Sequence, residues 1–126
     1  MISENLNNFN STVIDLAEQL SLICPNSIIS NNINLIKSVI KNKPTKIIEL
    51  FIIYVLPDKS KIDKGDDDFF LNKSYNDEVE KHSISINKVF EFKNIWNKIS
   101  IENQEVVKQY MQCLCYYSQE YFLEKY

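Results

Sequence analysis

The chain has no arginine, one glycine, one histidine and three prolines among its 126 residues. The absence of arginine removes the planar guanidinium that binds phosphates and carboxylates through two parallel hydrogen bonds. A single glycine, Gly65, excludes the glycine-rich loops that enclose nucleotide phosphates. Several common ways of building a ligand site are therefore closed to this sequence.

The abundant residues carry little functional information. Asn, Ile and Lys together make up over a third of the chain. All three have A/T-rich codons, whereas Arg, Gly, Ala and Pro do not, so we attribute the composition to an A/T-rich source genome. The same bias weakens any conclusion drawn from the missing arginine.

Charge gives no general attraction for polyanions, because the formal net charge is −3 and the isoelectric point is near 5.2. One local lysine cluster stands out, formed by Lys37, Lys41, Lys43 and Lys46. We interpret it as a solvated helix end and loop, with a phosphate-binding patch as the alternative. Nucleic acid is accordingly not the partner that we expect first.

Three cysteines, Cys24, Cys113 and Cys115, make an odd count, which favours a reducing, intracellular compartment. The first residues lack the basic and apolar regions of a secretory signal. The most apolar stretch, Ile47 to Leu56, is about ten residues long and contains Glu49, which is too short and too polar for a bilayer of roughly 30 Å. We therefore expect no membrane span.

Apolar residues recur at intervals of three and four in the first half of the chain, which predicts helices. The first runs from Leu6 to Ile23 and ends before Pro25. The second covers roughly Ser27 to Lys41, and the third lies between Pro44 and Pro57. The third is apolar on most sides, which favours a central position.

The pattern changes between Asp58 and Ser85, where four aspartates surround Gly65. We predict a helical turn from Lys59 to Lys64 that ends at Gly65, followed by an irregular acidic segment. The apolar run from Phe69 to Leu71 indicates that the middle of this segment is fixed to the core.

Helical spacing returns between Ile86 and Ile99, and Ser100 is a suitable N-cap for the last and longest helix. The sequence thus predicts an all-α fold, a single domain over residues 1–126. We expect one compact bundle of five or six helices, with the third and last helices central and an irregular segment around residues 58–85.

The acidic residues do not match a calcium loop. In an EF-hand, glycine is the sixth residue and glutamate the twelfth, whereas Gly65 is the third residue from Asp63. We predict a solvated turn and no metal site, although Asp66 and Asp68 are the first candidates if a cation binds. On a helix, Cys113 and Cys115 point about 200° apart, so they do not chelate one zinc ion by themselves.

No pair of residues has the spacing of a catalytic acid, base or nucleophile, so we predict that the chain is not an enzyme and needs no cofactor. His82 is flanked by Glu80 and Lys81, which favours a solvated loop over a general base.

Aromatic residues supply the candidate interface. The last helix carries Tyr116, about 100° from the apolar stripe that includes Tyr117 and Tyr121, and exposed tyrosines are favoured at interfaces. Together with Phe69 and Phe70 they form the predicted contact surface. The alternative is that the tyrosines cap a wide core.

Two blocks of the sequence resemble small helical proteins of nucleocytoplasmic large DNA viruses, especially mimivirus-like giant viruses. The residues that carry the resemblance are Phe51–Pro57, Ile62, Asp66–Leu71 and Tyr75, and then Trp96–Gln104, Val107, Tyr110, Met111 and Leu114. Asp58 departs from the pattern, because an aromatic residue is expected there. The resemblance implies a viral origin and a helical scaffold, and it carries over no catalytic residues.

Our leading hypothesis is a noncatalytic viral protein that binds other proteins or itself, as a component of the virion or of the replication compartment in the host cytoplasm. Nucleic-acid association through the lysine cluster is the first alternative, with binding that weakens steeply as salt rises. A helical-bundle regulator of host cell death is the second, in which an apolar groove accepts an amphipathic helix.

Overall fold

A computed structural model describes residues 3–74 and 86–126, and within these ranges the chain forms helices and loops without a strand. The all-α prediction is therefore confirmed. The seven α-helices in this part of the chain exceed the five or six predicted. They are α1 (Glu4–Ile23), α2 (Ile28–Asn31), α3 (Ile33–Asn42), α4 (Lys46–Tyr54), α5 (Lys59–Asp63), α6 (Asp67–Asn72) and α7 (Ile101–Lys125), with short 3-10 turns at Leu56–Asp58, Ile86–Phe90 and Trp96–Lys98.

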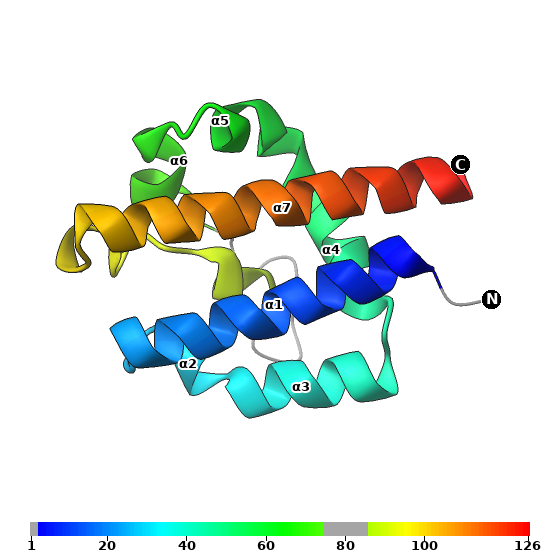
Figure 1. Ribbon diagram of the computed structural model, residues 1–126, viewed down its shortest axis with the longest axis horizontal. Helices are drawn as coiled ribbons and strands as arrows, with labels where there is room; N and C mark the ends of the chain where they lie inside the picture. Colours follow the sequence, from blue (N-terminus) through cyan, green and yellow to red (C-terminus); the bar gives the residue numbers. More distant parts are fainter. Residues whose placement is uncertain (1–2, 75–85) are drawn as a thin grey trace.

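The two longest helices, α1 and α7, lie side by side and antiparallel, with α3 beneath α1 and with α5 and α6 on the other side of α7 (Figure 1). The Ser3 side chain caps α1 by accepting a hydrogen bond from the Leu6 amide at 3.2 Å. Its hydroxyl also lies 2.9 Å from the Glu124 carboxylate, to which Asn5 donates as well. The start of α1 is thus fastened to the end of α7.

The second predicted helix is divided into α2 and α3. Asn32 lies between them with φ −114° and ψ 17°, outside the helical region. Its side-chain amide donates to the Ile28 carbonyl at 2.8 Å, a local bond that competes with a continuous helix. The many β-branched residues here lower the helix propensity of the segment, so little intrinsic preference opposes the break. The prediction of one continuous helix was wrong for this reason.

The third predicted helix is shorter than the interval between its two prolines. α4 begins at Lys46, while the Pro44 carbonyl accepts a hydrogen bond from Asn10 of α1 at 2.9 Å. α4 ends at Tyr54, and Pro57 lies in the following 3-10 turn, where its missing N–H is not needed.

The acidic segment is more ordered than predicted. α5 stops before Gly65, whose φ of +65° suits glycine, and this agrees with the prediction. Asp66 then caps α6, because its carboxylate accepts the Asp68 amide at 2.9 Å. Asp67 and Asp68 lie in the first turn, where the helix dipole favours negative charge. The aspartates therefore start a helix at 67–72, where the sequence analysis expected an irregular chain.

Lys108 of α7 holds the start of α6 in place. Its ammonium group lies 2.9 Å from Asp67 and 3.6 Å from Glu105, and 5.9 Å from the ring centre of Trp96. The hydrogen bond to Asp67 is the main reason why the pKa of Lys108 is raised. The ion pair thus links two elements that are far apart in the sequence.

Residues 86–99 form two 3-10 turns instead of the predicted helical stretch. The apolar residues between 88 and 99 are all buried: Val89, Phe90, Phe92, Ile95, Trp96 and Ile99. On an α-helix they would cover more than half of the circumference. A straight helix beside α7 would leave part of this wide apolar surface in water. The irregular backbone buries all six side chains.

The core is one cluster to which the seven described α-helices and residues 89–99 contribute. Phe51 of α4 packs edge-on against Phe9 and Phe90, each at 5.2 Å between ring centres. The Phe70 and Trp96 rings are stacked at 4.4 Å. α4 and α7 supply buried residues as predicted, and α1 shares the central position with them.

Shortening Phe70 to alanine is expected to lower the free energy of unfolding by about 3 to 5 kcal/mol, because the side chain is fully buried and stacks on Trp96. Urea unfolding measures this change. Tyr116→Ala is the control, since that side chain is 58% exposed and surface changes stay within about 0.5 kcal/mol. Equal effects of the two substitutions would contradict the described core.

Candidate functional site

The structure does not bring the five predicted interface residues onto one surface. Phe69, Phe70 and Tyr121 are 3%, 0% and 5% exposed, whereas Tyr116 is 58% exposed and Tyr117 is half-buried. Phe69 and Phe70 are core residues, as the expected fixing of the acidic segment requires. Buried rings offer no area to a partner, so the candidate surface cannot be built around them.

Exposed apolar side chains gather instead where the ends of α4 and α7 meet. Ile53 is 59% exposed, and Phe122, Leu123 and Tyr126 are 41%, 61% and 89% exposed. Ile53 and two of these line a groove of about 340 Å³, which we call the α4–α7 groove. Its lining residues are Glu49, Ile52 and Ile53 from α4, and Tyr121, Phe122, Lys125 and Tyr126 from α7 and the residue after it.

Aromatic rings give the α7 wall of the groove its shape. The rings of Phe122 and Tyr126 are in contact, with 4.9 Å between their centres. The Lys125 ammonium lies 5.4 Å from the ring centre of Tyr121. Tyr121 is also the main reason why the pKa of Lys125 is raised, and the nearby Glu49 carboxylate adds to the rise. Lys125 therefore stays positively charged at neutral pH.

Sequence reasoning missed this groove. It interpreted the wide apolar stripe of α4 as a sign of a central position in the bundle, although part of so wide a stripe can also lie at the surface. Ile47, Ile48 and Phe51 are buried, while Ile53 points outward. The available signal was the number of isoleucines in α4, four among nine residues, because one buried face does not accommodate all of them.

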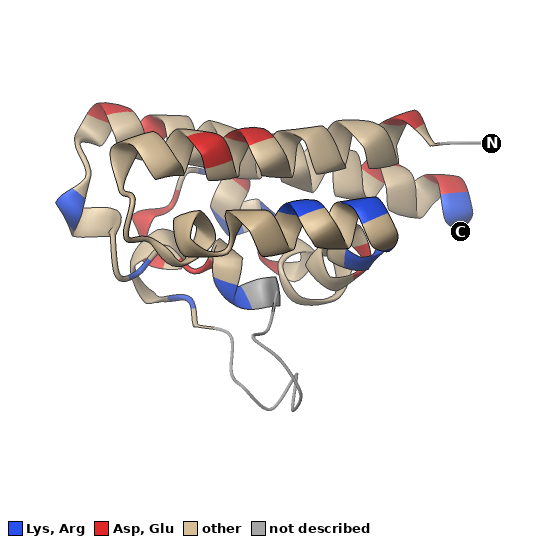
Figure 2. Ribbon diagram, turned by 90° about the horizontal axis from the view of Figure 1, so that it is seen from below, with Lys and Arg blue, Asp and Glu red and all other residues tan. Residues whose placement is uncertain are grey.

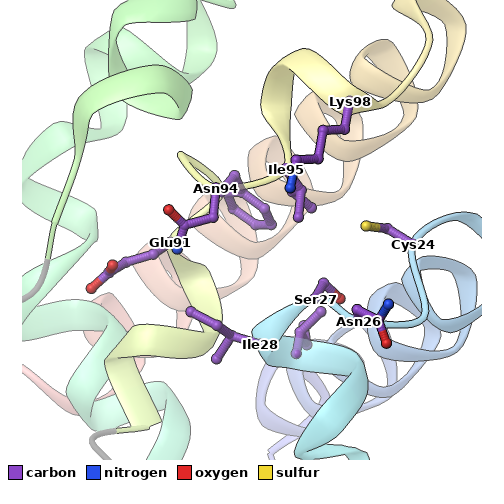
Figure 3. A pocket seen from close by; sticks show the side chains of 10 residues that line it. Cys24, Asn26, Ser27, Ile28, Glu91, Asn94, Ile95 and Lys98 are labelled. Atoms are coloured by element: carbon purple, nitrogen blue, oxygen red, sulfur yellow. The ribbon is translucent and has the colours of Figure 1, made fainter.

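A second, smaller cavity of about 140 Å³ lies between the start of α2 and residues 91–98 (Figure 3). The Cys24 thiol points into it, toward Ile95, as Figure 3 shows. The Cys24 carbonyl accepts hydrogen bonds from the Ser27 amide at 3.0 Å and the Ser30 hydroxyl at 3.1 Å, which fixes this corner. A lone thiol in a small mixed cavity does not define a reaction.

The candidate cation ligands have other roles. Asp66 caps α6, and Asp68 accepts a hydrogen bond from Asn72 at 2.7 Å. Across residues 3–74 and 86–126, no three His, Cys, Asp or Glu side chains lie together as metal ligands would. His82 and Tyr75 lie outside the described residues.

The lysine cluster spans the end of α3 and the start of α4. Lys37 is 3.8 Å from Glu18 of α1, Lys41 and Lys43 are exposed, and Lys46 is half-buried. Figure 2 shows both signs of charge spread over several helices. Binding of nucleic acid by these lysines stays a prediction.

Cys113 and Cys115 differ as their spacing predicts, because Cys113 is exposed and Cys115 is buried. Burial raises the pKa of the Cys115 thiol to about 12, and the charge of Asp63 adds to this effect. In the part of the chain that the structure describes, no helix has both the length and the apolar character to cross a membrane.

Comparison with models of known protein families, with curated proteins and with solved structures finds no match to this chain.

Alkylation of the folded protein is expected to modify Cys113 first and to leave Cys115 unmodified until the protein unfolds, because the thiolate is the reactive form. Mass spectrometry of peptides after a short exposure to iodoacetamide measures the two sites separately. Denatured protein is the control, in which both residues react. Simultaneous modification of Cys113 and Cys115 under native conditions would refute the buried position of Cys115.

Proposed function

We propose that this chain is a noncatalytic protein-binding protein and that its partner contacts the α4–α7 groove. The observation that carries this proposal is that Ile53, Phe122 and Tyr126, all exposed apolar side chains, line one groove between α4 and α7. Monomeric proteins rarely leave a large contiguous apolar surface in water, and such surfaces mark contact sites. Each Å² of apolar surface that a partner removes from water contributes about 25 cal/mol of favourable burial free energy.

The polar groups of the groove suit recognition better than chemistry. A lysine acts as a nucleophile or base when its pKa is lowered, whereas that of Lys125 is raised. Lys125 and Glu49 therefore act as two fixed charges of opposite sign beside an apolar surface. Charges at the rim of an interface select the partner and its orientation.

We further propose that the chain is a viral protein, on the resemblance described above. The structure shows what the resembling blocks do: Phe51 packs on Phe90, and Phe70 stacks on Trp96, all inside the core. A resemblance in these residues therefore concerns the scaffold. The α7 wall of the groove follows Leu114, so the resemblance does not extend to that wall.

The viral assignment predicts where the protein is found. In cells infected with a virus that encodes the chain, mass spectrometry is expected to detect it in purified virions or in the isolated replication compartment. A host protein abundant in the cytosol is the control for contamination. Detection of the chain in uninfected host cells would contradict a viral origin.

A photo-crosslinking amino acid at position 122 is expected to join the chain to a protein partner on irradiation in cells, because Phe122 lines the groove. The matched control carries the same amino acid in place of Leu22 of α1, which is 80% exposed but lies outside the groove. The readout is a light-dependent product of higher mass, identified by mass spectrometry. Absence of a product at position 122, or the same products at both positions, would refute the proposed function.

A further inference from the structure

We propose that the partner seated on the α4–α7 groove is the same groove of a second copy, so that the chain forms a dimer with two-fold symmetry. This inference rests on the proposed function, and it adds the identity of the partner. The dimer follows from how charge and apolar area are divided between the two walls of the groove.

The two walls carry opposite charges. Glu49 comes from α4, and Lys125 comes from α7. Both residues line the same groove of about 340 Å³ from its opposite walls, so a facing molecule in the groove meets both charges. Among the ion pairs of the described residues, none within 4.0 Å joins Glu49 to Lys125. Glu49 and Lys125 can therefore each pair with a charge on a facing molecule, Lys125 from its position over the Tyr121 ring.

Two-fold symmetry makes this arrangement complementary to itself. In such an interface each contact occurs twice, with residue i of one copy on residue j of the other and the reverse. When the axis runs along the groove, the α4 wall of each copy lies over the α7 wall of the other. Glu49 of each copy then faces Lys125 of its partner, and two intermolecular ion pairs form.

The apolar parts of the walls match in the same orientation. The α4 wall presents the branched side chains of Ile52 and Ile53, and the α7 wall presents the rings of Phe122 and Tyr126. In the dimer, isoleucines of one copy cover aromatic rings of the other. Aromatic residues are enriched at the centres of interfaces because their large rigid area is buried at a low entropy cost.

The charges and the apolar residues have different roles in this dimer. Exposed ion pairs add little stability, because water and salt screen them. They do fix orientation, since like charges placed opposite each other oppose association. We therefore expect the apolar residues to set the affinity and the two ion pairs to set the register.

Sedimentation velocity over a dilution series of the purified chain tests the apolar contribution. The wild-type chain is expected to change from dimer to monomer on dilution. Phe122→Ser is expected to weaken dimerisation by more than about tenfold, because it removes a ring at the centre of the contact. Leu22→Ser, an equally polar substitution on α1, is expected to leave the dissociation constant unchanged.

Charge reversal tests the symmetry. Glu49→Lys alone sets two ammonium groups against each other at both contacts, and Lys125→Glu alone sets two carboxylates against each other. Each variant is therefore expected to dimerise about tenfold more weakly than the wild type. An equimolar mixture is expected to form a heterodimer that binds more tightly than either variant alone, because both of its contacts join opposite charges. At one contact the native Glu49 faces the native Lys125, and at the other the two substituted side chains face each other with their charges reversed. An effect within one chain cannot be rescued by mixing. Circular dichroism melting curves show whether each variant folds.

The outcomes separate this inference from the proposed function. A wild-type chain that stays monomeric at all concentrations overturns the dimer, whereas a different protein crosslinked at position 122 still supports protein binding through the groove. A dimer whose dissociation constant does not change with Phe122→Ser also overturns the inference, because the contact then lies elsewhere. Charge variants that mixing does not rescue overturn it as well, because the contact then lacks this symmetry. A crosslink at position 122 between two copies supports both.

Discussion

The packing of α1 against α7 is the contact on which the rest of the structure depends. Each helix buries a stripe of apolar residues, including Phe9, Val13 and Leu16 of α1 and Met111 and Leu114 of α7. The shorter helices complete the core around this pair. α7 then reaches past the core to the groove, so the same helix that organises the fold supplies one wall of the proposed contact surface.

Local signals in the sequence were sufficient for the elements with one clear apolar stripe or a strong end signal. Leu6–Ile23 was predicted and α1 spans Glu4–Ile23, while Ser100 caps α7 by accepting the Asn103 amide at 3.1 Å. Gly65 ends α5 with a positive φ, which the sequence also indicated. In each case the determining interaction lies within about one helical turn, so the sequence around it contains the information.

Tertiary contacts determined the backbone of residues 86–99 and the burial of individual aromatic rings. These contacts join distant segments, so they cannot be predicted from the pattern of a single sequence. Residues 86–99 have helical spacing, but the space beside α7 buries more of their side chains when the backbone is irregular. Phe69 and Phe122 are the same residue type, yet one is buried and the other lies at the groove. Which aromatic ring faces water depends on what packs against it, and the neighbours come from distant segments.

The fastening of Ser3 and Asn5 to Glu124 has a consequence for synthesis of the chain. α1 is made before its main packing partner α7, which follows about 100 residues later, and this takes on the order of 5 to 20 s at typical elongation rates. Throughout that interval the apolar stripe of α1 lacks its native cover. The nascent chain therefore carries an uncovered apolar surface until α7 is complete, and a truncation within α7 is expected to leave that surface exposed.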